Sequence, residues 1–309
     1  MFHVDWLLPW DDAVHRIVPK TAGIERIAGG FGFTEGPLWT RQGDLLFSDI
    51  PNNTIFRWRP DATTGIFRHP SGYDGPPVAA GALVGSNGLT LDRVGRVCVC
   101  EHGNRRVTRL EDGGGVTVLA DRFEGRRLNA PNDLVFHSNG ALYFTDPPYG
   151  LPGLDRDPAK ELDFNGVFRL DNGALSLLFR DLSRPNGLAL SPDESVLYVA
   201  NSDRARMIWL RFSIADDGSL STPDLFADVT RETGAGVPDG MKVDVEGNLY
   251  CTGPGGIRIF EPGGKPLGLM AFPEVPANLH WGGADACTLY VTARTSVYRV
   301  TLSIPGVRP

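Results

Sequence analysis

The sequence predicts an all-β fold, a six-bladed β-propeller that forms a single domain over residues 1–309 and is closed by a strand from the N-terminal segment in its last blade. Three observations predict it. A two-stranded pattern recurs six times, with starts 39 to 54 residues apart, which is the spacing of propeller blades. Each copy is followed by another alternating strand. Finally, 38 Gly and 24 Pro supply the tight turns that such a fold requires.

Each repeat begins with an oxygen-bearing side chain, which precedes a strand, a turn and a second strand. The six first residues, in chain order, are Glu35, Asn87, Asn132, Asn186, Asp239 and Asn278. Third and fourth strands follow within the first five repeats. The sixth repeat reaches the end of the sequence without a fourth strand, and we expect residues 24–32 to supply it. Such closure removes the exposed sheet edges of an open array.

Residues 6–17 are the one helix candidate, expected to lie on the outside of the propeller. The segment 1–12 is acidic and lacks the apolar core of a signal peptide. No apolar run approaches the roughly 20 residues that a membrane helix needs. We therefore expect a cytoplasmic protein.

Composition narrows the range of partners. The 30 basic and 37 acidic residues give a formal net charge of −7, and no basic stripe is present, so we expect neither nucleic acid nor a membrane as partner. The four cysteines are expected to be reduced packing residues: Cys98, Cys100, Cys251 and Cys287. Nothing in the sequence indicates an oligomeric state.

The six first residues are expected to meet at one place. Equivalent positions of propeller blades surround a common axis, and the residue before the innermost strand lies at the mouth of the central channel. Turn preference explains a single Asn or Asp before Gly, but Glu35 is not a turn former. Two carboxylates and four amides, without Cys or His, indicate a hard divalent cation, best Ca²⁺, with Zn²⁺, Mg²⁺ and Mn²⁺ as alternatives.

Several motifs together resemble the SMP-30/gluconolactonase family of six-bladed propellers, between Phe31 and Val300. They are E-G-P-L-W, R-L-N-A-P-N-D-L, R-P-N-G-L-A-L-S-P-D, V-P-D-G-M-K-V-D-V-E-G-N-L-Y and L-Y-V-T-A-R-T-S-V-Y-R, and they stand in the family's order. The resemblance implies hydrolysis of a lactone with the help of a divalent cation.

The resemblance also implies roles for individual residues. Glu35, Asn186 and Asp239 match the metal ligands, and Asp239 matches the suspected base. Asn132 matches a position that contacts substrate or completes the metal shell. Asn87, like Asn278, is placed at the site by its register alone, and either contributes to the site or only builds a turn.

Five further residues are candidates for substrate contacts: His102, Arg127, Asn129, Asp146 and Tyr149. Arg127 and Asn129 either donate to substrate oxygens or make ordinary structural contacts. His102 is either a second proton carrier or a hydrogen-bonded polar residue. The insertion 147–164 is expected to form a rim loop over the pocket, with Tyr149 stacked against a substrate ring.

The sequence therefore predicts a metal-dependent hydrolase that opens a small-molecule lactone, such as glucono-1,5-lactone. The base is either Asp239 or a water activated by the cation. Two alternatives stay open: the same site acts on a non-sugar lactone, phosphotriester or other ester, or the protein is a binding propeller with a structural Ca²⁺. The motifs of serine hydrolases and of nucleotide-binding loops are absent from the sequence.

Overall fold

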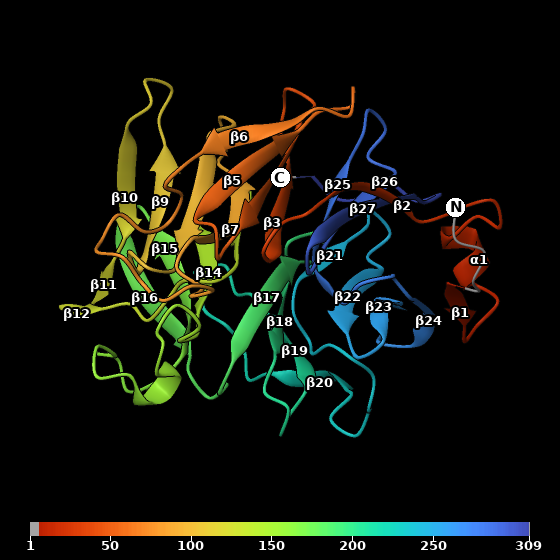
Figure 1. Cartoon of the computed structure of the whole chain (residues 1–309). Helices are drawn as coiled ribbons and strands as arrows, with labels where there is room; N and C mark the ends of the chain where they lie inside the picture. The colour runs from red at the N-terminus through yellow and green to blue at the C-terminus, as the bar shows by residue number, and fades with distance from the viewer. Residues whose placement is uncertain (1–5, 309) are drawn as a thin grey trace.

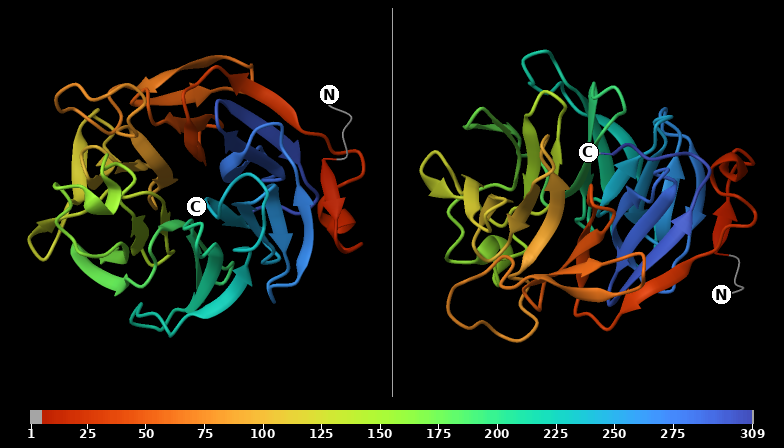
Figure 2. Two further views of the ribbon diagram at one scale, coloured as in Figure 1. Left: turned by 60° about the horizontal axis from the view of Figure 1, so that its bottom comes forward. Right: turned by 90° about the horizontal axis from the view of Figure 1, so that it is seen from above.

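The computed structural model describes residues 6–308, and in them six sheets surround a central axis as the blades of a β-propeller (Figures 1 and 2). The fold class predicted from the repeats is confirmed. Four-residue α1 (Val14–Ile17) and the 3₁₀ turn η1 (Leu154–Arg156) are the helical segments of the described residues. In blades 1 to 5 the strand closest to the axis comes first in the chain, and the other three follow outward in sequence order.

The blades are built as antiparallel sheets of consecutive strands. Blade 1 contains β3 (Thr34–Trp39), β4 (Leu45–Asp49), β5 (Thr54–Trp58) and β6 (Thr64–Arg68), and blade 2 contains β7 (Ser86–Leu91), β8 (Val97–Glu101), β9 (Arg106–Leu110) and β10 (Val116–Ala120). Blade 3 contains β13 (Leu134–Phe136), β14 (Leu142–Asp146), β15 (Gly166–Asp171) and β16 (Ala174–Phe179), and blade 4 contains β17 (Pro185–Leu190), β18 (Val196–Asn201), β19 (Ile208–Ser213) and β20 (Asp224–Asp228). Blade 5 contains β21 (Met241–Val243), β22 (Leu249–Gly253), β23 (Gly256–Phe260) and β24 (Pro266–Met270), and blade 6 contains β25 (Pro276–Gly282), β26 (Thr288–Ala293) and β27 (Ser296–Thr301).

The N-terminal segment closes the ring. β2 (Glu25–Gly29) pairs antiparallel with β27 and completes blade 6, which confirms the strand expected within residues 24–32. In Figure 2 this strand lies beside the last blade of the chain. A small hairpin of β11 (Arg122–Phe123) and β12 (Arg126–Arg127) stands apart from the blades.

The helix expected over residues 6–17 is wrong in extent. Its first part is β1 (Leu7–Pro9), which pairs with β24 as a fifth strand of blade 5. Only α1 is helical, and its Val14 and Ile17 are fully buried against blades 5 and 6. Residues 7–9 pair with the open edge of β24. Pro9 is tolerated there because an edge strand does not need every backbone N–H for pairing. The first five residues of the segment 1–12 lie outside the described residues.

The core lies between adjacent blades. Leu38 and Leu46 of blade 1, for example, pack against Leu89 and Val99 of blade 2, and all four are at most 4% exposed. Since the apolar side chains of each sheet are buried on both faces, every blade depends on its neighbours. The four cysteines are free, and Cys98, Cys100 and Cys251 are buried, whereas Cys287 is partly exposed. Within residues 6–308, no helix is long and apolar enough to cross a membrane.

Candidate active site

The inner strands are irregular at four of the six first residues, namely Glu35, Asn87, Asn186 and Asn278. The pairing of β3 with β4 shifts register between Glu35 and Leu38, and that of β17 with β18 shifts between Pro185 and Leu188. Similar shifts occur in β7 and β25. Such a bulge turns a side chain out of the regular alternation of a strand. Here it directs the first residues toward the axis, at the end of the channel where the inner strands begin, which we call the site end.

Glycines bring adjacent blades close together at the site end. A Cβ atom added to Gly36 would lie 2.0 Å from the carbonyl oxygen of Asn87, and one added to Gly187 would lie 2.2 Å from the carbonyl oxygen of Asp239. Gly36 also has a φ of +47°, which glycine adopts without steric cost. The glycine after the first residue therefore permits backbone contact between blades, and the first residues are held around a narrow channel.

Hydroxyl groups from the second strands hold the first residues in place. Ser48 Oγ donates to the carbonyl oxygen of Asn87 at 2.7 Å, and Thr145 Oγ1 donates to that of Asn186 at 2.7 Å. Each of these bonds joins one blade to the next. Because buried hydrogen bonds of this kind satisfy carbonyls that water does not reach, they stabilise the backbone geometry of the site.

Three carboxylates converge at the site end. Glu35 and Asp133 are buried, each 3% exposed, and Asp239 is partly exposed. Burial, with Asp133 as an added negative neighbour, raises the pKa of Glu35 to about 7. Burial, followed by repulsion from Glu35 and Asp133, raises the pKa of Asp239 well above its ordinary value. Like charges in a poorly hydrated space favour either protonation or a cation between them.

Asp133 was not among the residues expected at the site. Its Oδ1 accepts a hydrogen bond from the backbone of Leu134 at 2.9 Å, whereas its buried Oδ2 has no partner among the described residues. The sequence does carry a signal for it. Repeats 1, 2, 4 and 5 have glycine after the first residue, but the third repeat has Asp133 there.

Hydrogen bonds orient two of the amides in opposite ways. Asn186 Nδ2 donates to Ser202 Oγ at 2.8 Å, and the same amide hydrogen-bonds the Asp239 carboxylate, so its oxygen remains available as a ligand. Asn278 Oδ1 instead accepts from the backbone of Leu279 at 2.8 Å, and its amide hydrogen-bonds Glu35. Asn278 therefore orients Glu35, and its oxygen already accepts one hydrogen bond.

Asn87 and Asn132 differ in their surroundings. The imidazole Nε2 of His102 lies 3.2 Å from Asn87 Nδ2, and its Nδ1 lies 3.3 Å from the carbonyl oxygen of Leu83. His102 is 1% exposed, and burial lowers its pKa to about 4, so it is neutral near pH 7 and orients Asn87. The side chain of Asn132 is 4% exposed and makes no hydrogen bond to another described residue, which leaves it free for a ligand.

The remaining candidates lie beside the insertion 147–164. Asn129 and Asp146 are fully buried: Asp146 Oδ2 accepts from the backbone of Asn129 at 2.7 Å, and Asn129 Nδ2 donates to the carbonyl oxygen of Phe164 at 2.9 Å. This pair fastens both ends of the insertion 147–164. Arg127 donates to the carbonyl oxygen of Asn104 at 2.8 Å and is only partly buried.

Tyr149 is the insertion residue that reaches the carboxylates. Its hydroxyl hydrogen-bonds Ser202, and burial together with the nearby Asp239 carboxylate raises the pKa of Tyr149 to about 12. The hydroxyl is therefore a neutral donor near pH 7. Ser202 in turn donates to the carbonyl oxygen of Pro238 and accepts from Asn186, so one serine connects the rim to the channel. Ser202 was not among the residues expected from the sequence.

The donor set fits a divalent cation that prefers oxygen. Among residues 6–308, no group of three or more His, Cys, Asp or Glu side chains is arranged to hold a metal ion. A cation at the site end would therefore bind amide oxygens as well as carboxylates, as hard cations do. Glu35 and Asp239 would supply the charge, Asn132 and Asn186 would supply amide oxygens, and the unpartnered Oδ2 of Asp133 would add negative potential.

The fold and this site define a class of protein, namely six-bladed propellers with an acidic, amide-lined site at one end of the central channel. The chain belongs to the family described as the SMP-30/Gluconolactonase/LRE-like region, which it matches over residues 33–295. It is 44% identical over 298 residues to a gluconolactonase from Zymomonas mobilis, covering 92% of this chain and 82% of that protein.

Two further relatives agree with this assignment. A lactonase, drp35, from Staphylococcus aureus is 28% identical over 248 residues, covering 77% of this chain and 69% of that protein. The solved structure of a gluconolactonase from Xanthomonas campestris has a TM-score of 0.82 and 30% identity, covering 97% of this chain and 96% of that chain. The family resemblance identified in the sequence is thus confirmed over most of the chain.

Proposed function

We propose that this protein is a hydrolase that opens lactone rings, most specifically a sugar lactone such as glucono-1,5-lactone, and that it requires a divalent cation, with Ca²⁺ the best match to its ligands. The observation that carries the proposal is the convergence of Glu35 and Asp239 with free amide groups at one end of the channel. The 44% identity to a gluconolactonase supports the choice of substrate. A small lactone is accordingly the proposed partner.

Four residues would hold the cation, namely Glu35, Asn132, Asn186 and Asp239. A bound divalent cation supplies Lewis acidity that polarises the substrate carbonyl and lowers the pKa of water. The protein orients these ligands through groups behind them. Ser202 fixes the Asn186 amide, and Asn278 fixes the Glu35 carboxylate. Such supporting hydrogen bonds commonly set how tightly a metal is held.

The residues account for each proton in the reaction. Water adds to the carbonyl carbon of the lactone, and Asp239 accepts the proton that this water loses. The bond between the carbonyl carbon and the ring oxygen then breaks, and Asp239 returns the proton to the ring oxygen. The product is an open-chain hydroxy acid. Tyr149 lies beside Asp239 with its hydroxyl hydrogen-bonded to Ser202, and Asn132 offers its free amide to the substrate.

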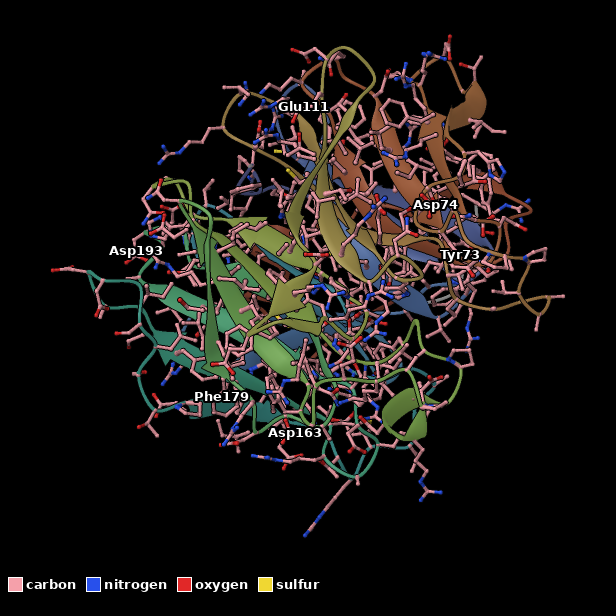
Figure 3. All side chains as sticks on the ribbon, turned by 90° about the vertical axis from the view of Figure 1, so that its left-hand side faces the viewer. Tyr73, Asp74, Glu111, Asp163, Phe179 and Asp193 are labelled. Carbon is pink, nitrogen blue, oxygen red and sulfur yellow. The ribbon has the colours of Figure 1, made fainter. Side chains whose placement is uncertain are left out.

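The test is acid release from a panel of lactones, simple esters and a phosphotriester by the wild type and by Asp239→Asn, each with and without Ca²⁺. Turnover of aldonolactones by the wild type, its loss in Asp239→Asn and a folded variant are the expected results. Asp193→Asn is the matched control, because Asp193 lies in the β17–β18 turn, beyond the end of β17 opposite to Asn186, and is seen at the left edge of Figure 3.

Other outcomes of this test contradict the proposal. Faster turnover of the esters or the phosphotriester than of any lactone would overturn the substrate class. No turnover of any compound, combined with a lower melting temperature and loss of bound Ca²⁺ in Asp239→Asn, would show that the cation is structural.

A further inference from the structure

A second cavity lies at the other end of the channel, where the inner strands end, which we call the turn end. Its volume is about 210 Å³, and it is lined by the ends of β7, β13 and β17 together with Lys242, His280 and Arg308. Leu89, Leu134 and Leu188 line it, each two residues after a first residue of its repeat. None of the six first residues lines this cavity. It is therefore separate from the candidate active site.

The walls of the cavity are mostly apolar, but its charged groups are not balanced. Lys242 Nζ donates only to the carbonyl oxygen of Met241, at 3.0 Å, and forms no ion pair with any acid in residues 6–308. Arg93 and Arg308, at the same cavity, likewise donate to backbone carbonyls and form no ion pair among these residues. The cavity thus contains three cationic side chains without a carboxylate partner in the described chain.

The acids beside the cavity are already engaged. Asp92 pairs with Arg96 at 2.7 Å, and Glu194 accepts from the backbone of Ser138 at 2.8 Å and lies 3.3 Å from His137. They leave no carboxylate for Lys242. An ammonium group that is partly removed from water without a counter-charge is unfavourable, and an anion that enters the cavity relieves this cost.

One carboxylate of the site end is within electrostatic reach of Lys242. The Lys242 charge is a minor influence that lowers the pKa of Glu35, although the two side chains form no ion pair within the described residues. Glu35 does not line the cavity. It therefore leaves the ammonium group open to a ligand at the turn end.

His280 adds a fixed polar group to the same wall. It is 4% exposed, and its Nδ1 lies 2.7 Å from the carbonyl oxygen of Trp281 and 3.3 Å from the backbone nitrogen of Trp39, which donates to it. Nε2 makes no hydrogen bond to any residue in the described part of the chain. A ligand that also carries a hydroxyl group would find a hydrogen-bonding nitrogen here.

We propose that this cavity is a second ligand site, which binds a small organic anion consisting of a carboxylate on a compact apolar body. The carboxylate bonds to the ammonium group of Lys242, and the apolar body lies against Leu89, Leu134 and Leu188. The volume sets the size of the ligand, since it is smaller than the roughly 300–1,000 Å³ of sites for drug-sized molecules. This site does not depend on the proposed lactonase activity.

The probe is benzoate, titrated into the full chain by calorimetry at constant ionic strength. Benzyl alcohol tests the need for charge, and acetate and inorganic phosphate test the need for an apolar body. We expect benzoate to bind at least about tenfold more tightly than each of the three. Equal binding of phosphate or acetate would overturn the proposal, because it would show a cationic surface without a shaped site.

Variants locate the binding. Lys242→Met should weaken benzoate binding by about tenfold or more, whereas Lys242→Arg should keep it within about threefold. Lys20→Met, at an exposed lysine, is the charge-matched control and should bind like the wild type. A crystal structure of the wild type with benzoate makes the test independent of how the variants fold. No benzoate binding, an unaffected Lys242→Met variant, or a carboxylate bound away from Lys242 would each refute the proposal.

Discussion

Replacing Glu35 by glutamine tests whether the buried carboxylate that would hold a cation destabilises the folded protein when no cation is bound. Burial raises the pKa of Glu35 from 4.5 to about 7. This difference corresponds to about 3 kcal/mol. Because the folded protein binds this proton more tightly than the unfolded chain, the cation-free protein loses this stability as pH rises from 4.5 to 7. The amide of the Glu35→Gln variant does not ionise, so the variant has no such loss.

At pH 8 in EDTA, Glu35→Gln should therefore be up to about 3 kcal/mol more stable than the wild type. Near pH 4 the two should be similar, because Glu35 is then protonated in the folded protein. Ca²⁺ at about 100 times its Kd should stabilise the wild type by about 2.7 kcal/mol and the variant much less. Urea unfolding followed by tryptophan fluorescence, at each pH with EDTA or Ca²⁺, measures these differences.

Glu124→Gln, at an exposed residue, is the matched control and should follow the wild type in every condition. The reasoning is refuted if Glu35→Gln is no more stable than the wild type at pH 8 in EDTA. It is equally refuted if Ca²⁺ stabilises both proteins by the same amount.

Two further predictions concern the groups behind the ligands. Ser202→Ala removes the hydrogen-bond partner of the Asn186 amide and should weaken Ca²⁺ binding by about 10- to 100-fold in calorimetry. The exposed Ser219→Ala variant is the control and should bind Ca²⁺ like the wild type. Equal affinities of Ser202→Ala and the wild type would contradict the role given to Ser202. Because burial lowers the pKa of His102 from 6.5 to about 4, the unfolded chain takes up this proton first, and the contribution of His102 to stability should fall by about 3 kcal/mol as pH decreases from 6.5 to 4, opposite in sign to that of Glu35. His102→Gln should reduce this fall in urea-unfolding measurements, and an unchanged pH profile would show that His102 is not buried in its neutral form.

The fold could be predicted because its signal is repeated. Six copies of one pattern identify the blades, and the missing fourth strand of the last copy identifies β2 as the closing strand. The expected helix over residues 6–17 failed for a reason outside that segment. Leu7–Pro9 pairs with the open edge of β24, and the local sequence contains no information about that edge.

The site was only partly predictable. The repeats place Glu35, Asn186 and Asp239 at equivalent positions, and equivalence in a closed ring means proximity. They do not show which atom of an amide faces the channel. Asn186 and Asn278 occupy the same register, yet their amides are oriented differently. The nitrogen of Asn186 donates to Ser202 and leaves its oxygen available, whereas the oxygen of Asn278 accepts from the Leu279 backbone.

The sequence by itself determined the number of blades, the ring of first residues and the family, because each follows from a pattern along the chain. Only the tertiary structure decided what the glycines do, since a Cβ at Gly187 would meet Asp239 of the next blade at 2.2 Å. It also decided that Asp133 joins the two predicted carboxylates and that Lys242 faces a cavity without an acidic partner in the described chain. The physical reason is that burial and charge balance depend on which blades meet, and residues far apart in the chain meet only once the ring has closed.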